Sequence, residues 1–297
     1  MFACAICALL YCSAADVETV WPKGKMPHSQ AHQIAAMTDA AGSKDFKPEK
    51  HRVAYIEWMP APDKSVRTDA CMILISGGSY QCCCDVNLVK QWCERLTREG
   101  IQCVNFVYRT PRPEGLAKHT TAWQDLQRAI KLVRSQPAQY GLDGNQIGIM
   151  GSSAGGHLTL MGVTSSMHQA YNPIDEIDRT PCNVQWGIGI YPAYVLSDGA
   201  DGENSGKGNA DDATIVPDFS FDLNTAPMIF IHGDADGYSP MGSVKVWEKM
   251  RSMGIQSELH TLCLRQHCFQ RVASPGTGSY TWLDRIGEFL RARNILK

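Results

Sequence analysis

A short turn of small residues constrains this chain more than any other feature. Residues 151–155 read Gly-Ser-Ser-Ala-Gly; they follow a mostly apolar run, 146–150, and open a stretch rich in small residues, 156–163. This pattern predicts a strand, a sharp turn and a helix, with the motif G-x-S-x-G centred on Ser153. The central serine of such an elbow has a strained backbone, and only small residues two positions away avoid a clash. The turn therefore predicts a nucleophilic serine at a sheet edge, beside a helix N-terminus that favours negative charge.

The motif alone is also found in ordinary strand-to-helix turns, so Ser153 needs an acid and a base as partners. A triad built on this elbow has the chain order Ser, Asp or Glu, His. The apolar run 228–232 predicts a buried strand, which Asp234 and Asp236 follow. A carboxylate at the carboxyl end of a parallel strand lies on the ligand side of the sheet. Both aspartates also suit a turn or a helix cap; because Asp234 follows the strand at once, we assign it that structural role and predict Asp236 as the acid.

His267 is the predicted base. It follows the strand-like segment 257–263 and lies in the loop 265–269, before the last predicted helix. His260 competes for the role, but it lies within the alternating strand and is expected to be half-buried there. Structural interpretations also suit two other histidines, one at a strand end and one on a helix face: His232 and His157.

A second glycine-rich turn predicts an oxyanion hole. The apolar run 71–75 predicts a strand, and Ser76-Gly77-Gly78-Ser79-Tyr80 follows it. Backbone N–H groups of this turn, with the N–H of Ala154 after the nucleophile, would bind the negative oxygen of a tetrahedral intermediate. The predicted donors are Gly77, Gly78, Ser79 and Ala154. The alternative is an ordinary tight turn between a strand and a helix.

Together these motifs resemble the α/β-hydrolase superfamily, and within it the bacterial acetyl xylan esterase-like group, some of whose members are described as pectin acetylesterases or feruloyl esterase-like proteins. The resemblance implies a serine esterase that removes acetyl groups from plant polysaccharides such as xylan and needs no cofactor. The family usually has three glycines in the oxyanion turn, whereas this chain has Ser79 in the third place. The hole is expected to survive that change if the φ angle of Ser79 is negative. The segments that carry the resemblance are 20–22, 26–27, 76–80, 107–109, 151–158, 232–236 and 267–269.

Substrate-binding residues are expected at the ends of the early strands. Tyr80 and Tyr108 lie near strand ends and are predicted to stack on a sugar, although tyrosines at such positions are more often part of the core. Arg109 begins a segment, 109–120, that leaves a strand end on the ligand side. The segment 197–226 is long, acidic and poor in apolar periodicity, and we expect it to form part of the substrate rim.

Length and composition fit a single α/β domain. The chain has 297 residues, of which 44% are hydrophobic and 20% are charged, with a net charge of -2. Nucleic-acid binding is not expected, because it would require a concentrated positive surface and the chain has no long basic run. No apolar run is long enough to span a membrane. A metal site at Cys82-Cys83-Cys84 is disfavoured because adjacent cysteines cannot easily turn towards one ion. The sequence leaves the oligomeric state open.

The first fifteen residues resemble a secretory signal. Residues 2–12 are apolar, and Ser13-Ala14-Ala15 supplies small residues at cleavage spacing, which predicts removal of 1–15 and a secreted or periplasmic protein. A lipoprotein signal and a buried N-terminal helix are the alternatives. Removal would leave nine of the twelve cysteines, so at least one thiol would be unpaired within the mature chain. The pattern of disulfides stays open.

The rest of the chain, 16–297, is predicted to be one catalytic domain with the α/β-hydrolase fold. Apolar strands of about five residues alternate with helices, and this pattern indicates a mostly parallel central sheet with helices on both faces. Within this domain, a polar leader, 16–50, is expected to precede the alternating strands and helices. The expected strands are 52–59, 71–75, 102–108, 147–150, 185–191, 228–232 and 257–263, and the expected helices are 86–98, 121–135, 154–163, 243–251 and 280–293.

The sequence thus predicts a secreted serine carboxylesterase acting on acetyl or similar short acyl groups of polysaccharides. The alternatives are a general short-chain esterase, a serine peptidase-like enzyme of the same fold, and a non-catalytic binding protein. Peptidases with this core normally carry an additional propeller domain, for which the chain is too short. Non-catalytic relatives usually lack a triad residue, whereas all three candidates are present here.

Overall fold

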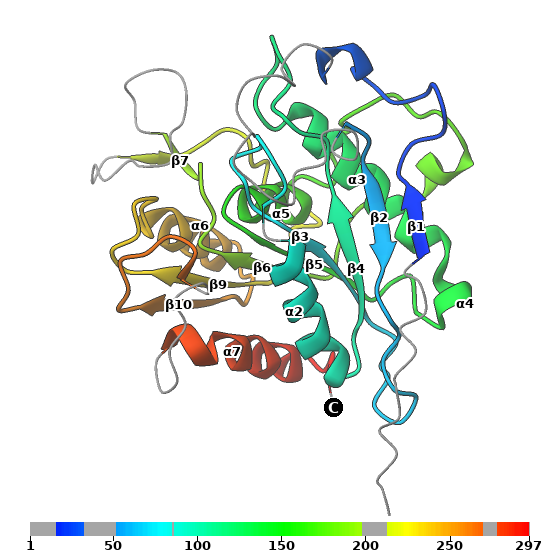
Figure 1. The fold of residues 1–297 in the computed structure, drawn as a ribbon. Coiled ribbons are helices and arrows are strands. Elements are labelled where there is room, and N and C mark those ends of the chain that lie inside the picture. The colour runs from blue at the N-terminus through cyan, green and yellow to red at the C-terminus, as the bar shows by residue number, and fades with distance from the viewer. Residues whose placement is uncertain (1–15, 33–51, 85, 198–212, 270–277, 297) are drawn as a thin grey trace, which may run out of the picture.

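The computed structural model describes residues 16–32, 52–84, 86–197, 213–269 and 278–296 (Figure 1). Eight strands form one sheet in the order β1-β2-β4-β3-β5-β6-β9-β10. β1, β2 and β4 pair antiparallel, and every neighbouring pair from β4 to β10 is parallel. The strands are β1 (Asp16–Thr19), β2 (Tyr55–Trp58), β3 (Cys71–Ile75), β4 (Gln102–Val107), β5 (Ile147–Ser152), β6 (Trp186–Ile190), β9 (Met228–Gly233) and β10 (Glu258–Leu262). The mostly parallel sheet confirms the predicted fold class.

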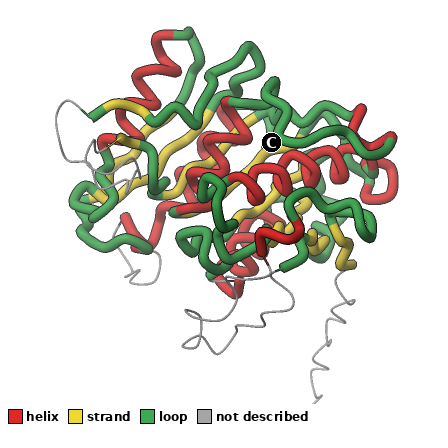
Figure 2. The backbone as a smooth tube through the Cα atoms, turned by 90° about the horizontal axis from the view of Figure 1, so that it is seen from above, coloured by secondary structure: helices red, strands yellow, loops and turns green. Residues whose placement is uncertain are grey.

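The sheet has helices on both faces because successive strand residues point to opposite sides. In β3, Ile73 packs in a cluster with Leu126 and Leu158, whereas Met72 and Leu74 pack in a second cluster. The first cluster includes residues of α3, α5 and α6, and the second includes residues of α2 and α7. Figure 2 shows the layer of strands between the helices. The helices are α2 (Val86–Arg98), α3 (Thr120–Ser135), α4 (Pro137–Tyr140), α5 (Ala154–Thr164), α6 (Met241–Ser252) and α7 (Gly278–Ala292), with short 3-10 turns η1 (Ser29–His32) and η3 (Glu176–Arg179).

The N-terminal leader differs from the prediction. Its first residues form the edge strand β1, and Val20 and Trp21, which follow, are buried in the core. Trp21 is anchored by its indole N–H, which donates to Asp125 Oδ1 at 2.6 Å. The leader thus begins as part of the sheet, because β1 pairs with β2 and the two residues after it are buried in the core. The predicted signal segment, 1–15, lies outside the described residues.

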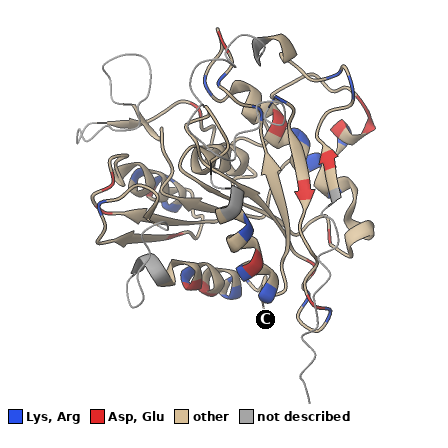
Figure 3. Cartoon of the chain, in the orientation of Figure 1, with Lys and Arg blue, Asp and Glu red and all other residues tan. Residues whose placement is uncertain are grey.

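The centre of the sheet carries no charged side chains. The five central strands, β3, β4, β5, β6 and β9, contain no Lys, Arg, Asp or Glu, while α7 carries both signs (Figure 3). Among the described residues, no helix combines the length and apolar character needed to cross a bilayer.

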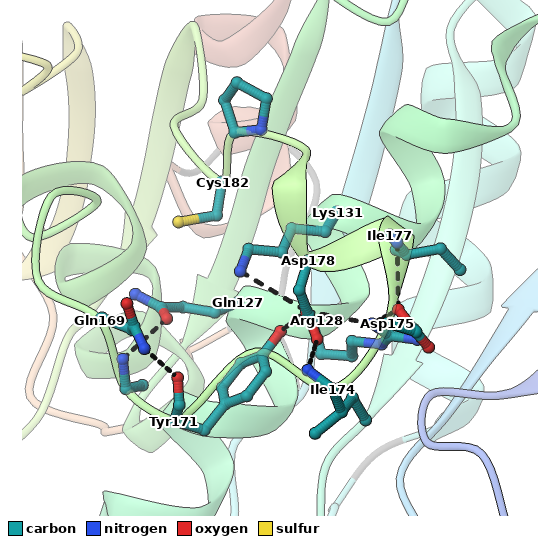
Figure 4. Close-up of polar contacts among 12 residues, drawn as sticks. Gln127, Arg128, Lys131, Gln169, Tyr171, Ile174, Asp175, Ile177, Asp178 and Cys182 are labelled. Carbon is teal, nitrogen blue, oxygen red and sulfur yellow. Dashed lines mark hydrogen bonds and ion pairs between the residues drawn. The ribbon is translucent and has the colours of Figure 1, made fainter.

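A network of charged residues joins α3 to η3 (Figure 4). Arg128 contacts both Asp175, at 2.6 Å, and Asp178, at 3.0 Å, and Lys131 Nζ lies 3.6 Å from Asp178. Burial of Asp178 favours its neutral form, but hydrogen bonds from the Tyr171 hydroxyl and other groups outweigh this effect, and its pKa lies below the usual value. The network holds the segment after α5 against α3.

A buried ion pair fixes the segment after β4. The Arg109 guanidinium lies 2.7 Å from Asp125 of α3, and both side chains are fully buried. The Arg109 backbone N–H also donates to Asp125, at 2.9 Å. Burying two charges is costly unless both are fully bonded, so the loss of one partner leaves an uncompensated charge in the core.

We expect Asp125→Ala to lower the free energy of unfolding by about 3–5 kcal/mol, because it leaves the Arg109 guanidinium buried and unpaired. Urea denaturation followed by fluorescence measures the change. The matched control is Glu176→Ala, which breaks an ion pair with Arg179 in which both side chains are 80% exposed, and we expect it to unfold near the wild-type midpoint. Equal midpoints for the two variants would contradict the stabilising role of the buried pair.

Candidate active site

Ser153 lies on the sharp turn between β5 and α5. Its φ and ψ angles are +55° and -120°, a strained conformation for a residue other than glycine. The turn tolerates no side chain at Gly155, because a Cβ atom there would lie 2.6 Å from the carbonyl oxygens of both Ile75 and Ser76. The strand–turn–helix arrangement predicted from the sequence is therefore present, and it holds Ser153 at the carboxyl edge of the sheet.

The structure brings the three predicted catalytic side chains together. Ser153 Oγ lies 2.8 Å from His267 Nε2, although 114 positions separate them in the chain. His267 Nδ1 in turn lies 2.8 Å from Asp236 Oδ2 and 3.0 Å from Asp236 Oδ1. These contacts form a continuous path for a proton from hydroxyl to imidazole, with a carboxylate beyond it. The arrangement suits the activation of a serine nucleophile by a general base.

Asp236 is held in its charged form. It is 6% exposed and accepts a hydrogen bond from the Tyr238 N–H at 2.9 Å. Burial opposes ionisation of the carboxyl, but hydrogen bonds from His232 and His267 outweigh burial, and the pKa of Asp236 lies well below its usual value. Asp234, the alternative acid, is exposed at the surface. The charged carboxylate stabilises a positive charge on His267 and fixes the orientation of its ring.

Two of the competing histidines, His260 and His232, have the structural roles that the sequence suggests. His260 is half-buried in β10 and lies 3.2 Å from Glu258. His232, at the end of β9, contacts Ser243 Oγ at 2.9 Å and the Tyr238 carbonyl at 3.0 Å. Its Nε2 also lies 3.6 Å from Asp236 Oδ2, so it supports the carboxylate, a role that the sequence did not reveal.

The second glycine-rich turn lies directly against the nucleophile. A Cβ atom at Gly77 would be 2.9 Å from Ser153 Cβ. Among the described residues, the N–H groups of Gly77, Gly78, Ser79 and Ala154 have no hydrogen-bond acceptor. The φ angle of Ser79 is +55° and that of Tyr80 is +61°, so the condition of a negative φ at Ser79 is not met. The turn adopts the glycine-like conformation without the third glycine.

This conformation of Ser79 has a visible support. Its carbonyl oxygen accepts a hydrogen bond of 2.9 Å from Arg112 Nε, and Arg112 also donates to the Tyr194 hydroxyl at 3.2 Å. Serine at positive φ is strained. The arginine holds the turn in that shape from outside.

The three predicted sugar-contacting residues are corrected by the structure. Tyr80, Tyr108 and Arg109 are each at most 1% exposed. The Tyr80 hydroxyl lies 2.8 Å from His157 Nδ1, and the Tyr108 hydroxyl donates to the Ser76 carbonyl at 3.2 Å. Arg109 is occupied by Asp125, as described above. Their side chains therefore support the oxyanion turn and the core, and none offers a face to a sugar.

Two other tyrosines pack against the catalytic imidazole: Tyr191, which is buried, and Tyr238, which is half-buried. The rings of Tyr191 and Tyr238 each lie 4.7 Å, between centroids, from the ring of His267. Tyr194 packs on Tyr238 at 5.6 Å. The sequence analysis missed these residues, although Tyr191 and Tyr194 follow β6 at the same edge of the sheet where the nucleophile lies. That strand-end position is the signal that points to them.

The rim segment is described only in part. β7 (Leu196–Ser197) pairs antiparallel with β8 (Thr214–Ile215) in a separate two-stranded sheet. The acidic residues that the sequence places in this segment fall at 198–212, outside the described residues: Asp198, Asp201, Glu203, Asp211 and Asp212. After β8, Asp218 returns to the core near the nucleophile helix.

The three consecutive cysteines lie beside the oxyanion turn. Cys82 Sγ and Cys84 Sγ are 2.9 Å apart, whereas Cys83 is buried and donates to the Tyr108 carbonyl at 3.6 Å. Burial raises the pKa of the Cys83 thiol to about 12. None of the nine cysteines in the described part of the chain forms a disulfide.

A group of potential metal ligands lies beneath the site. His119, His157 and Asp218 each offer one ligand atom, and these atoms lie within 4.8 Å of one another. His157 belongs to the first turns of α5, and its backbone N–H bonds to the Ser153 carbonyl at 3.0 Å. Burial lowers the pKa of His157 to about 4, so that its imidazole is neutral at pH 7. The helix-face interpretation of His157 overlooked this group because its other two members are distant in the sequence.

Comparison with known proteins agrees with the geometry. Residues 58–250 match the family BD-FAE. The chain belongs to the BD-FAE family of α/β-hydrolase esterases. Its membership confirms the predicted superfamily, and hydrolysis of carboxylic esters is the reaction class of the family.

The curated relatives match over limited segments. Endo-1,4-beta-xylanase B of Butyrivibrio fibrisolvens is 32% identical over 88 residues, which cover 30% of this chain and 14% of the relative. Esterase LipC of Mycobacterium tuberculosis is 27% identical over 176 residues, which cover 54% of this chain and 42% of the relative. The chain thus spans less than half the length of either relative.

The solved structures match over almost the whole fold. The acetyl ester-xyloside bifunctional hydrolase of Caldicellulosiruptor lactoaceticus has a TM-score of 0.71 at 21% identity, with 97% of this chain and 100% of that chain covered. Esterase 2 of Thermogutta terrifontis, with propionate bound, has a TM-score of 0.67 at 19% identity, with 96% and 97% covered. At these identities the likeness shows the fold.

Proposed function

We propose that this protein is a serine carboxylesterase that removes acetyl or similarly short acyl groups from polysaccharides such as xylan. The observation that carries the proposal is the contact of Ser153 with His267, and of His267 with Asp236, next to a turn whose N–H groups have no acceptor among the described residues. Membership of the BD-FAE family supports the reaction class.

In the proposed mechanism, Ser153 Oγ attacks the ester carbonyl while His267 Nε2 takes the hydroxyl proton. Asp236 stabilises the resulting imidazolium and keeps Nε2 directed at the serine. The N–H groups of Ala154 and of the Gly77–Ser79 turn bind the negative oxygen, and loss of one such donor typically costs about 3 kcal/mol. The tetrahedral intermediate collapses, His267 returns the proton to the leaving alcohol, and an acyl-serine remains. Water, deprotonated by His267, then releases the carboxylic acid and restores Ser153.

The choice of a short acyl group on a sugar rests on two supports. The matched solved structure is described as an acetyl ester-xyloside hydrolase, and one matched relative is a xylanase. A general short-chain esterase of the same fold is the second candidate, favoured by the matched esterases LipC and esterase 2.

A comparison of substrates separates these two candidate functions. Acetate release from acetylated xylan is compared with hydrolysis of p-nitrophenyl acetate, p-nitrophenyl butyrate and a peptide p-nitroanilide. We expect kcat/KM to fall from acetate to butyrate by at least about tenfold, to be undetectable for the anilide, and acetate to be released from xylan. A faster reaction on butyrate than on acetate, without release from xylan, would favour the general esterase. A preference for the anilide would contradict the esterase assignment.

Export and domain organisation stay predictions. The segment 1–15 lies outside the described residues, so cleavage after Ala15 and a secreted or periplasmic location rest on the sequence alone. The proposal of one catalytic domain over 16–297 likewise rests on the single run of alternating strands and helices. N-terminal sequencing of the protein from its native host tests the cleavage site.

A further inference from the structure

Two histidines and an aspartate converge below the active site from three separate elements. His119 precedes α3, His157 lies in α5, and Asp218 lies in the segment that follows β8. His119 Nδ1 and His157 Nε2 each lie 3.2 Å from the same carboxylate oxygen, Asp218 Oδ2. The side chain of His157 is fully buried, and those of His119 and Asp218 are 16% and 17% exposed. Water therefore has little access to the point where the three groups meet.

The orientation of the rings is unusual for histidine–carboxylate hydrogen bonds. Both nitrogens are within reach of the carboxylate, yet neither His119 Nδ1 nor His157 Nε2 makes a hydrogen bond of acceptable angle in the described part of the chain. A hydrogen bond requires the N–H to point at the oxygen. The ligand atoms of the three residues nevertheless lie within 4.8 Å of one another. This is the arrangement expected when the atoms share a partner at a common point.

The other nitrogen of His157 fits the same interpretation. His157 Nδ1 lies 2.8 Å from the Tyr80 hydroxyl. A histidine that binds a metal through Nε2 normally donates its remaining N–H to an oxygen, which fixes its tautomer and orientation. Tyr80 supplies that oxygen from the oxyanion turn. The buried phenol thus has a reason to face the imidazole.

The donor set selects the class of ion. Two imidazole nitrogens and one carboxylate oxygen suit Zn²⁺ and related divalent transition metals, whereas Ca²⁺ and Mg²⁺ prefer oxygen ligands only. Zn–N and Zn–O bonds of about 2.0–2.1 Å in a tetrahedral site separate neighbouring ligand atoms by about 3.3 Å. Both nitrogen–oxygen separations, at 3.2 Å, already have this length. The fourth position of the tetrahedron would belong to water.

We propose that His119, His157 and Asp218 bind one Zn²⁺ ion that ties the segment after β8 to α3 and α5. The ion would lie one helical turn beyond the nucleophile, since His157 follows Ser153 by four residues. Its ligands do not include Ser153, His267 or Asp236, so it serves to position the rim segment and, through Tyr80, the oxyanion turn. The site is separate from the proposed ester chemistry.

Zinc binding to the full-length protein tests the proposal. Protein stripped with a chelator is titrated with ZnCl₂ by calorimetry, and its thermal unfolding is recorded with and without the metal. We expect one equivalent of Zn²⁺ per chain and a rise in Tm of about 5 °C at a free concentration of about 100 times Kd. Asp218→Asn and His119→Gln are expected to weaken zinc binding by about 100-fold and to lose the rise in Tm. Both residues are partly exposed, so these variants are better placed to fold than one at the fully buried His157.

The controls distinguish this site from other zinc ligands in the chain. His260→Gln removes a histidine that also lies 3.2 Å from a carboxylate but belongs to no group of potential metal ligands among the described residues, and we expect this variant to bind zinc as the wild type does. The double variant Cys82→Ser, Cys84→Ser should also retain the one equivalent. The proposal is overturned if zinc neither binds to the wild type nor raises its Tm. It is also overturned if zinc binding survives Asp218→Asn and disappears in the cysteine variant. Neither result depends on esterase activity, so the proposed function is tested separately.

Discussion

Ser153→Ala is expected to lower kcat for p-nitrophenyl acetate by about 10⁵-fold, and to leave the fold intact. The hydroxyl is the only group that the change removes, and its Oγ lies 2.8 Å from Nε2 of His267, the imidazole that would deprotonate it. A residual rate above that in water is expected from the oxyanion donors. Steady-state kinetics on protein freed of contaminating esterases, together with the thermal midpoint, measure the two effects.

The neighbouring residue supplies the control for this variant. Ser152 is the last residue of β5 and is as well buried as Ser153, at 5% against 8% exposed. Ser152→Ala is expected to retain most of the wild-type activity. A Ser153→Ala protein that keeps a tenth of the activity would mean that another group attacks the ester.

Asp236→Asn is expected to lower kcat by about 10⁴-fold. An asparagine amide at this position donates a hydrogen bond to His267 Nδ1, where the carboxylate accepts one. The imidazole then carries its proton on Nε2, facing Ser153, and has no lone pair with which to accept the serine proton. The loss should appear in kcat with little change in KM, because Asp236 is buried behind the histidine.

Asp234→Asn is the matched control, since Asp234 lies two residues away and is exposed at the surface. It should react at close to the wild-type rate. If Asp234→Asn lost activity and Asp236→Asn did not, the sequence and the geometry would both have identified the wrong carboxylate.

The sequence predicted the elements that are determined locally. The helix 86–98 and the strand 71–75 have the bounds of α2 and β3, because continuous apolar runs and helical periodicity mark them. Ser153, Asp236 and His267 could be proposed because each follows a strand, and the carboxyl ends of parallel strands share one edge of the sheet. Because this fold always places these strand ends at one edge, the order of the residues along the chain was sufficient to propose the three catalytic residues.

The sequence could not predict which strand-end side chains turn inward. Tyr80, Tyr108 and Arg109 lie at strand ends, but their partners are His157, the Ser76 carbonyl and Asp125. Each partner lies on a separate element, and no local pattern records the contact. For the same reason His119, His157 and Asp218 carried no signal as a group. Their proximity depends on how α3, α5 and the segment after β8 pack.

The oxyanion turn shows a further limit of sequence reasoning. Because positive φ is costly for residues with a side chain, the oxyanion hole was expected to survive the serine at position 79 only if its φ angle were negative. The structure keeps the positive φ and holds the carbonyl of Ser79 with Arg112, which is 33 residues away. A long-range hydrogen bond outweighs a local preference here.

Covalent labelling by a fluorophosphonate, located by peptide mass spectrometry, tests the central claim most directly. The reagent reacts only with a serine whose proton is removed by a neighbouring base and whose oxyanion is stabilised. We expect one adduct per chain, on Ser153, with labelling abolished in Ser153→Ala and strongly slowed in His267→Ala. A folded protein that takes up no label, or that carries it on a serine remote from His267, would contradict the account.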